Sequence, residues 1–148
     1  MLDREGLLAE ARLAAEHAYA PYSRFRVGAA VLVRTSEGPR VVTGANVENA
    51  SYGLTLCAER NALAAACMLD GAAPSAGSKV NQRKPHVLAV AVACVDAPRE
   101  ASAAQRSPCG ACRQWLAELA PDAVYYVDGI PGELRLPDLL PYAFRMEG

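Results

Sequence analysis

Three cysteines and one glutamate in this chain have the residue types and the spacing of a catalytic metal site. Cys57 stands two residues before Glu59, and Cys109 and Cys112 follow in the order Pro-Cys-Gly-Ala-Cys. Zinc in a structural site usually has four protein ligands, whereas a catalytic zinc has three and keeps one position for water. Such water is acidic enough to supply hydroxide near neutral pH, and a nearby carboxylate can carry its protons. The pattern predicts zinc-assisted hydrolysis with Glu59 as the proton carrier.

Other uses of these cysteines stay open from the residues alone. The pair Cys109 and Cys112 could be half of a structural zinc site, or a thiol redox pair at a helix start. Cys67 and Cys94 lie among apolar residues and are expected in the core, although either could be a fourth ligand of a structural site. Neither alternative requires a glutamate two residues after Cys57, so we favour catalytic zinc.

Both cysteine groups are expected near helix N-termini. The range 107–120 begins with Ser-Pro, which suits a helix start, and the range 56–70 would carry Cys57 and Glu59 in its first turn. The positive end of a helix dipole favours thiolate over thiol, which offsets part of the excess charge of three thiolates on Zn²⁺. Arg60 could hydrogen-bond a ligand sulfur and withdraw more charge, or it could be a solvated helix residue.

Length and composition describe a small globular enzyme rather than a nucleic-acid or membrane protein. The 148 residues are expected to form a single domain, 1–148, with 52% apolar and 21% charged residues. A net charge of −1 without a dense Lys/Arg run argues against a nucleic-acid partner. The charged first residues are untypical of a signal peptide, and the apolar run 87–95 is too short to span a membrane. Five cysteines, an odd number with metal-type spacing, indicate a reducing, cytoplasmic setting.

The order of expected elements predicts an α/β fold with three layers. Periodicity and turn residues suggest a mixed sheet of five strands with helices on both faces, and loops at 71–85 and 97–107. The two cysteine-bearing helices would begin at one edge of this sheet, where ligands of open α/β sheets tend to bind. The expected helices are 4–18, 56–70, 107–120 and a short turn at 137–140, and the expected strands are 27–33, 40–45, 87–95, 123–127 and 133–136.

Several stretches stand in the order seen in cytidine deaminases, and the resemblance covers nearly the whole chain. The segment 139–144 also resembles the C-terminal segment of that family. Position 57 is a cysteine, whereas the related deaminases of transfer RNA and deoxycytidylate typically have histidine there, so the chain resembles the branch that acts on free nucleosides. The other matching stretches are Tyr-Ala-Pro-Tyr-Ser at 19–23, Phe-Arg-Val-Gly-Ala-Ala at 25–30, Asn-Val-Glu-Asn-Ala at 46–50, Cys-Ala-Glu-Arg at 57–60 and Ser-Pro-Cys-Gly-Ala-Cys-Arg-Gln at 107–114.

The resemblance implies hydrolytic deamination of cytidine and deoxycytidine to uridine and deoxyuridine with release of ammonia, a step of pyrimidine salvage. One zinc ion would be held by the three cysteines, and Glu59 would pass the proton of the attacking water to ring N3 and a second proton to the leaving amine. Asn46 and Glu48 would hold the ribose hydroxyls, although without the family they would be turn residues. The resemblance also implies that Phe25 packs on the pyrimidine, where the residues alone favour a core aromatic, and that the backbone of Ala58 contacts the base.

The resemblance further implies a homotetramer with shared active sites. Residues similar to Ala50, Tyr52 and Phe144 would reach the site of a neighbouring subunit.

The chain departs from the family in the long gap between Cys57 and Cys109. The extra length lies in 71–85 and 99–106, and the second of these runs directly into Cys109, where it could shape the pocket mouth. The preferred nucleoside therefore stays open. Blasticidin deaminase, which acts on a nucleoside antibiotic, shares the Cys-Ala-Glu and Pro-Cys-x-x-Cys patterns, whereas the stretch 46–49 is closer to the cytidine enzymes.

Overall fold

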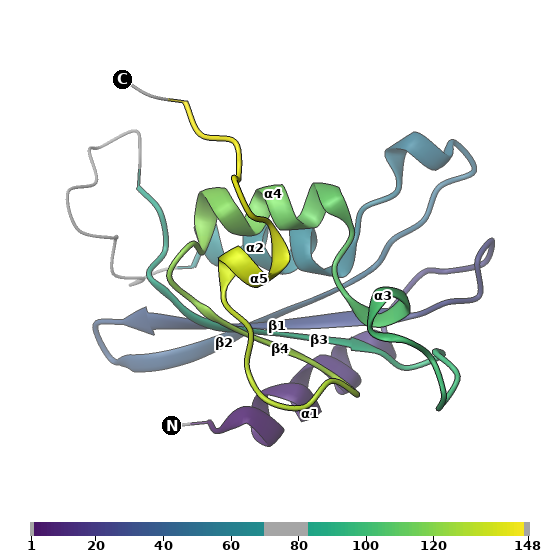
Figure 1. Ribbon diagram of the computed structural model, residues 1–148, viewed down its shortest axis with the longest axis horizontal. Helices are drawn as coiled ribbons and strands as arrows, with labels where there is room; N and C mark the ends of the chain where they lie inside the picture. The colour runs from purple at the N-terminus through teal and green to yellow at the C-terminus, as the bar shows by residue number, and fades with distance from the viewer. Residues whose placement is uncertain (1, 70–82, 147–148) are drawn as a thin grey trace.

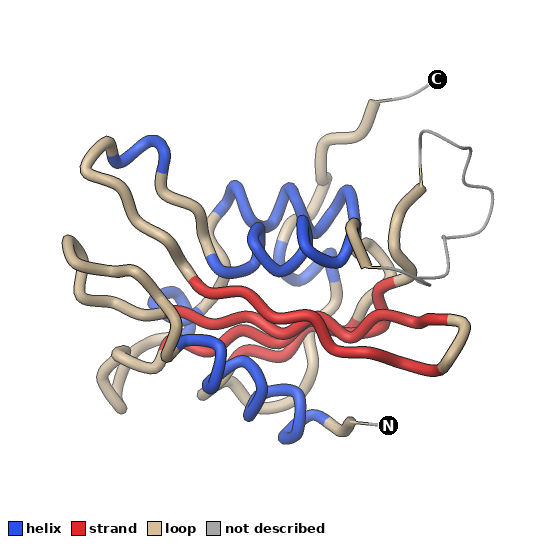
Figure 2. Tube along the Cα trace, turned by 180° about the vertical axis from the view of Figure 1, so that it is seen from behind, coloured by secondary structure: helices blue, strands red, loops and turns tan. Residues whose placement is uncertain are grey.

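The protein is a four-stranded sheet with helices on both faces, which confirms the expected three-layer α/β fold (Figure 1). This computed structural model describes residues 2–69 and 83–146, so most of the expected loop 71–85 lies outside the described residues. Helix α1 covers one face, and α2, α4 and α5 cover the other (Figure 2). The elements are α1 (Arg4–Ala15), β1 (Val27–Thr35), β2 (Gly38–Ala45), the 3₁₀ turn η1 (Tyr52–Leu54), α2 (Ala58–Cys67), β3 (Val87–Cys94), α3 (Ala103–Arg106), α4 (Gly110–Leu119), β4 (Val124–Val127) and α5 (Leu136–Leu139).

The strand order β2-β1-β3-β4 places the two most buried strands in the centre of the sheet. β1 pairs antiparallel with β2 through the expected hairpin, in which Gly38 has a φ of 103°. β1 also pairs antiparallel with β3, whereas β3 and β4 are parallel. A parallel pair needs a crossover connection, and the chain from β3 through α3 and α4 to β4 supplies it. This crossover carries α4, and with it two of the three site cysteines, to the end of β3.

The expected fifth strand at 133–136 is wrong. Only Leu134 pairs with β4, through two backbone hydrogen bonds with Tyr125, each 2.9 Å long. The chain then turns at once into α5, because the Asp138 carboxylate accepts a hydrogen bond from the Arg135 backbone N–H at 2.7 Å and caps the helix start. The proline in the first turn of α5 also suits a helix start. A single bridged residue is too short to count as a strand.

All four expected helices differ at one or both ends, and one helix was not expected. α1 stops at Ala15 rather than 18, because Tyr19 leaves the helix and exchanges backbone hydrogen bonds with Asn46 and Glu48. α3 lies inside the expected loop 97–107, where Ser102 and Gln105 form a capping box. Within the described ranges the longest helix has 12 residues, and none is long and apolar enough to cross a membrane.

α2 and α4 begin later than expected, with a cysteine at the N-cap of each. Cys57 precedes α2 and Cys109 precedes α4, and both have extended backbone conformations. Neither cysteine side chain makes a capping hydrogen bond. Both sulfurs are therefore available to another partner at the positive ends of the two helices.

The position of α2 over the sheet depends on a residue without a side chain. A Cβ at Gly44 in β2 would lie 2.5 Å from the backbone nitrogen of Ala62 and 2.8 Å from the carbonyl oxygen of Ala58. Real Cβ atoms do not approach so closely, and helix backbone cannot swing aside as a flexible side chain does. Gly44 therefore sets how near the first turn of α2 lies to the sheet.

We predict that Gly44→Ala destabilises the protein by about 1–3 kcal/mol, the usual cost of inserting a methyl group into packed structure. The pressure falls on Ala58, next to the first site cysteine, so the affinity for zinc should fall as well. Urea denaturation and a zinc titration measure the two effects. Thr43→Ser, a conservative change at the exposed neighbouring position, is the matched control. A Gly44→Ala variant as stable as this control would contradict the close approach.

Candidate active site

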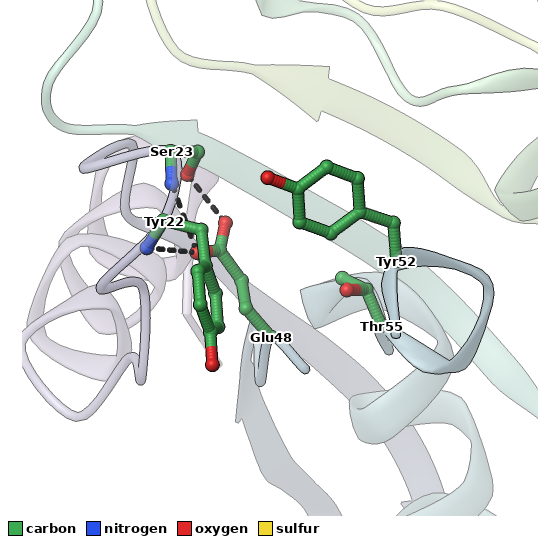
Figure 3. Close-up of a pocket in the computed structure, with 5 residues that line it drawn as sticks. All are labelled: Tyr22, Ser23, Glu48, Tyr52 and Thr55. Carbon is green, nitrogen blue, oxygen red and sulfur yellow. Dashed lines mark hydrogen bonds between the residues drawn. The ribbon is translucent and has the colours of Figure 1, made fainter. Parts of the chain in front are cut away.

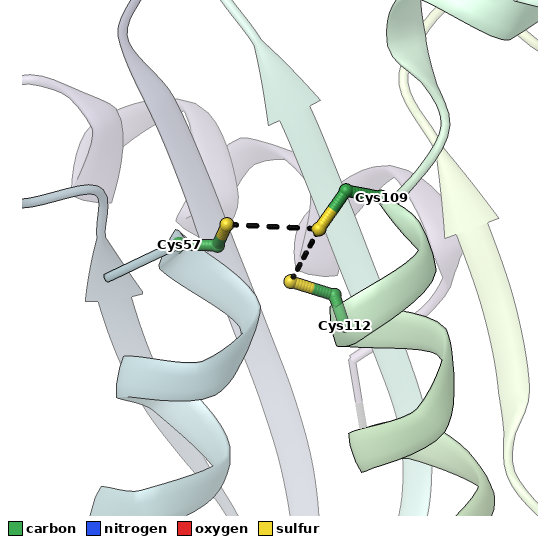
Figure 4. A group of neighbouring side chains, drawn as sticks. All are labelled: Cys57, Cys109 and Cys112. Atoms are coloured by element: carbon green, nitrogen blue, oxygen red, sulfur yellow. Dashed lines mark hydrogen bonds between the residues drawn. The ribbon is translucent and has the colours of Figure 1, made fainter. Parts of the chain in front are cut away.

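Three cysteine sulfurs meet where the starts of α2 and α4 converge (Figure 4). The Sγ atoms of Cys57, Cys109 and Cys112 all lie within 4.8 Å of one another. Cys57 and Cys109 sulfurs are 3.8 Å apart, and Cys109 and Cys112 sulfurs are 3.4 Å apart. Cys57 comes from the N-cap of α2, and the other two come from the N-cap and first turn of α4.

The donor set and its spacing fit a zinc ion with an open position. Zinc–thiolate bonds of about 2.3 Å in a tetrahedron separate the sulfurs by about 3.8 Å, close to the observed distances. A disulfide would need about 2.05 Å, and all five cysteines are free. Among residues 2–69 and 83–146, no fourth His, Cys, Asp or Glu ligand joins this cluster. The four-cysteine alternative is therefore wrong, and three ligands leave one position for water.

The two remaining cysteines lie outside the cluster and differ in burial. Cys94 at the end of β3 is buried, as expected, and burial raises its pKa to about 11. Cys67 is exposed at the C-terminal end of α2, so its expected place in the core is wrong. The apolar residues of α2 that pack in the core, Ala62, Leu63 and Ala66, lie on the side facing the sheet, whereas Cys67 and Met68 are exposed.

Hydrogen bonds between the thiols, and the guanidinium of Arg60 beside them, shift the pKa values of the cluster cysteines. Hydrogen bonding from the Cys112 thiol, and to a smaller extent from Arg60, lowers the pKa of Cys57 to about 5. The Cys112 pKa is raised, first because its proton is shared with Cys57 and then by burial. Nη2 of Arg60 lies 3.5 Å from the Cys57 sulfur and donates to the Thr55 carbonyl at 3.1 Å. Arg60 is thus fixed by the backbone in a position that lowers the charge on a ligand sulfur.

Glu59 is buried directly beside the sulfurs. Its side chain is only 4% exposed, and its Oε2 lies 3.5 Å from the Cys112 sulfur. Burial raises the pKa of Glu59, and the negative charge of Cys57 raises it further. A carboxyl group with a raised pKa can both accept and return a proton near neutral pH. Glu59 lies beside the sulfurs rather than among them, as a proton carrier requires.

A cavity of about 420 Å³ opens onto this cluster. Its volume lies in the range of pockets that hold small molecules. It brings the thiols and Glu59 together with all four residues expected to bind substrate, namely Phe25, Asn46, Glu48 and Ala58. Gln105 also lines the cavity, from the segment 99–106 that was expected to shape its mouth, and Cys94 lines it without belonging to the sulfur cluster. The remaining lining residues were not expected at the site from the sequence: Ser23, Val27, Thr55 and Ser107.

Asn46 is buried and uses its amide group to hold the chain that carries Phe25. Its Oδ1 accepts a hydrogen bond from the Val27 N–H, and its Nδ2 donates to the Phe25 carbonyl, both at 2.9 Å. The amide still has one N–H and one lone pair free for a ligand. Asn46 therefore fixes one wall of the cavity while facing it.

Glu48 is tied to the turn at Tyr22 and Ser23 (Figure 3), and it lines both the main cavity and a smaller one. One carboxylate oxygen accepts from the backbone N–H groups of Tyr22 and Ser23 at 3.1 Å each, and the other accepts from the Ser23 hydroxyl. These hydrogen bonds, with that of the Ser23 hydroxyl first, lower the pKa of Glu48. The smaller cavity, about 380 Å³, lies between Tyr22 and Tyr52, whose rings are 6.1 Å apart, edge to face.

The residues expected to reach a neighbouring subunit are exposed. Tyr52 is 75% exposed and Phe144 is 68% exposed, and Ala50 is exposed as well. Tyr52 lines the smaller cavity, whereas Ala50 and Phe144 line neither this cavity nor the one beside the thiols. Phe144 is held near the outer face of α4, where its carbonyl accepts a hydrogen bond from the Gln114 side chain at 3.1 Å.

Comparison with known proteins decides the family. The family model described as the cytidine and deoxycytidylate deaminase zinc-binding region matches residues 1–128. The chain belongs to this family.

Relatives of this deaminase family match over their full lengths. A cytidine deaminase of Halalkalibacterium halodurans is 43% identical over 99% of this chain and 97% of its own. One of Mycobacterium tuberculosis is 42% identical over 99% of this chain and 92% of its own. The crystal structure of the Burkholderia pseudomallei cytidine deaminase superposes with a TM-score of 0.72 at 38% identity, covering 97% of this chain and all of that one.

The family assignment identifies the ion that the cluster binds. The matched region is a zinc-binding region, and the three thiols are the part of this deaminase that holds one zinc ion. The redox alternative for Cys109 and Cys112 loses its support, because Cys57 and Glu59 share the site with them.

We predict that Cys57→Ala, Cys109→Ala and Cys112→Ala each reduce the zinc content well below one ion per chain, because each removes one of three ligands. Zinc content is measured by mass spectrometry after gel filtration. Cys67→Ala is the matched control and should keep one zinc, and Cys94→Ala should keep it too, since neither sulfur belongs to the cluster. Loss of zinc from either control variant would show that the site has a fourth protein ligand.

Proposed function

We propose that this deaminase converts cytidine and deoxycytidine to uridine and deoxyuridine by hydrolysis, with release of ammonia. The observation that carries this proposal is the buried Glu59 carboxyl beside a cluster of three thiols, at a cavity of about 420 Å³ that Cys57, Glu59 and Cys109 line. The reaction needs an activated water at C4 of the pyrimidine and a group that moves two protons, and the site provides both. The names of the relatives agree with this reaction.

Cys57, Cys109 and Cys112 would hold the zinc ion, which would make water acidic enough to act as hydroxide near neutral pH. Glu59 would accept a proton from the attacking water and donate it to ring N3, while the water oxygen attacks C4. Glu59 then takes the proton of the new C4 hydroxyl and delivers it to the amine, which leaves as ammonia. Glu59 ends each turnover ionised, as it began, so protons balance.

The nucleoside would lie with its pyrimidine against Phe25 and its ribose toward Asn46 and Glu48. The Ala58 backbone at the start of α2 would contact the base. An amide with one free N–H and a carboxylate can together satisfy sugar hydroxyls, which both donate and accept. Because the Glu48 carboxylate is already hydrogen-bonded to the backbone, it is preorganised to accept a hydrogen bond from a ribose hydroxyl without moving.

The reaction would serve pyrimidine salvage, because it returns cytosine nucleosides to the uracil series. We place the enzyme in the cytoplasm, where thiols stay reduced, in keeping with five free cysteines. The net charge of −1 favours a free nucleoside over a nucleic acid as substrate, because a nucleic acid would need a basic surface.

We further propose that four copies of the chain assemble and share their active sites. Exposed aromatic and aliphatic side chains lie next to the cavity mouth and on the C-terminal segment, including Tyr52, Leu54, Tyr142 and Phe144. Large apolar side chains exposed together mark interaction surfaces. A neighbour that covered them would also close the smaller cavity beside Glu48, so that Ala50, Tyr52 and Phe144 would complete an adjacent site.

Glu59→Gln should bind zinc and fold normally but lose at least about 10,000-fold in turnover, because Glu59 acts as both base and acid and one such role is worth about 100- to 10,000-fold. Turnover is measured by the release of ammonia from cytidine and by the loss of the cytosine absorbance. Glu16→Gln, the same change at an exposed position of the chain, is the control. A zinc-loaded Glu59→Gln variant with a tenth of normal turnover would rule out the proton-carrier role.

Glu48→Gln should lower kcat/KM for cytidine by about 10- to 150-fold, the value of one charged hydrogen bond of about 1.5–3 kcal/mol. Free cytosine should be a poor substrate of the unaltered enzyme, because ribose contacts position the ring. Ser23→Ala is the control, since it loosens the carboxylate from the turn but keeps its charge. If Ser23→Ala lowered kcat/KM as much as Glu48→Gln does, or if kcat/KM were the same for cytosine and cytidine, Glu48 would only hold the turn and would not bind ribose.

The tetramer proposal predicts that Phe144→Ala weakens assembly and activity together, whereas Leu13→Ala, an exposed apolar truncation on α1, changes neither. Light scattering and turnover measure both. Shared sites also predict that Phe144→Ala and Glu59→Gln, each weakly active alone, regain activity when their subunits are mixed. A fully active monomer, or mixed subunits without recovery, would exclude shared sites.

A further inference from the structure

The segment 96–107 joins β3 to the cysteines of α4 and forms one side of the cavity mouth. We call it the wall segment. Its first residue, Asp96, is held by Arg26, whose backbone N–H donates to it at 2.8 Å and whose guanidinium donates to both carboxylate oxygens at 2.9 and 2.8 Å. Arg26 follows Phe25, so the wall segment is tied to the chain that carries the expected base-packing ring.

The far end of the wall segment is held by the Arg106 side chain. Its guanidinium donates to the carbonyls of Pro98 at 2.8 Å, Arg99 at 3.2 Å and Ala101 at 3.2 Å, all within the same segment. It also donates to the Asp128 carbonyl after β4 at 3.5 Å. An arginine presents five N–H donors in a rigid fork, which lets one side chain hold several carbonyls at once. A long surface segment thereby becomes a fixed structure.

Two further features make room for Arg106 and extend its hold. Gly129 leaves space for the guanidinium, because a Cβ there would lie 2.8 Å from its Nη1. The Arg106 carbonyl accepts a hydrogen bond from the Cys94 thiol at 3.6 Å. Cys94 lines the cavity, so the side chain of Arg106 holds the outer part of the segment and its backbone contacts the cavity wall.

Gln105 and Ser107, on either side of Arg106, line the cavity. Both side chains hydrogen-bond the backbone at the start of α3, in which Gln105 lies and which Ser107 follows. Gln105 accepts a hydrogen bond from the Ser102 N–H at 3.0 Å, and the Ser107 hydroxyl donates to the Ala103 carbonyl at 2.7 Å. The two side chains are therefore presented to the cavity in one arrangement.

The proposed function assigns the remaining walls and leaves one edge of the pyrimidine for Gln105 and Ser107. C4 must lie at the thiols, N3 at Glu59 and the ribose at Asn46 and Glu48. C5 follows C4 around the ring on the side away from N3. Gln105 and Ser107 line the cavity together with Cys109, which follows the wall segment in the chain. In the proposed orientation of the ring, the wall segment would adjoin the C5 edge.

We propose that Arg106 is a positioning residue that holds Gln105 and Ser107 against the C5 edge of the bound pyrimidine, and so limits the size of the group a substrate can carry there. This inference rests on the proposed function, because the orientation of the ring comes from it.

The test compares Arg106→Gln with Arg99→Gln, the same substitution at an exposed side chain of the same segment. Dissociation constants of cytidine and 5-iodocytidine are measured by calorimetry in the Glu59→Gln background, where turnover is blocked. Arg106→Gln should lower the dissociation constant of 5-iodocytidine relative to that of cytidine by about tenfold or more, which is the scale on which a pocket discriminates small groups. Hydrogen exchange across 96–107 should become faster in the same variant. Arg99→Gln should change neither measurement.

A second pair of variants tests the position of the Arg106 side chain without replacing that residue. Gly129→Ala should push the Arg106 guanidinium away and change the ratio of the two dissociation constants as Arg106→Gln does. Gly38→Ala is the control: it carries a similar backbone cost, at a φ of 103°, but its Cβ meets nothing within 4 Å, so the ratio should not change. If Arg106→Gln leaves exchange in 96–107 unchanged, or speeds exchange without changing the ratio, the proposal is overturned. If the unaltered enzyme binds cytidine but does not turn it over, only the proposed reaction is rejected. The ratio of the two dissociation constants would still test the role of Arg106 in the wall segment. Failure to bind cytidine would reject both.

Discussion

The meeting of two helix N-termini at one point is the constraint on which the rest of this structure depends. Three thiols can gather only where positive potential offsets their charge, and the N-caps of α2 and α4 provide it. The crossover from β3 to β4 carries α4 to this point, and Gly44 lets α2 approach the sheet closely enough to meet it. Helix starts, sheet order and one glycine therefore act together to build a single metal site.

Burial then gives the chemistry its second component. Glu59 lies in the first turn of the same helix as Cys57, so the helix that supplies a ligand also places a carboxyl group beside the sulfurs. The low exposure of Glu59 raises its pKa, while Arg60 in the next position lowers the charge on Cys57. Three consecutive residues, from Ala58 to Arg60, thus place a stretch of cavity wall, a buried carboxyl group and a cation at the cysteine cluster.

The cavity around this site is built by side chains that bind backbone groups. Asn46 holds the carbonyl of Phe25 and the N–H of Val27, Glu48 holds the turn at Tyr22 and Ser23, and Arg106 holds four carbonyls across two loops. Hydrogen bonds of this kind fix segments that have no regular secondary structure of their own. A preformed cavity loses less entropy when it binds a ligand than a flexible one does. The polar residues of the lining therefore serve both the shape of the cavity and its chemistry.

The sequence by itself determined the features that depend on neighbouring residues. The spacing of the three cysteines, the helix starts beside them, the β1–β2 hairpin and the placement of Glu59 beside the sulfurs all follow from residue types a few positions apart. Tertiary structure alone decided the features that depend on distant partners. Leu134 could not extend a strand because Asp138 starts a helix, Cys67 is exposed because its side of α2 faces away from the sheet, and the order of 96–107 comes from Arg106 and from Arg26, seventy residues before Asp96. Local patterns record short-range physics, whereas packing and hydrogen bonds between remote segments exist only once the chain has folded.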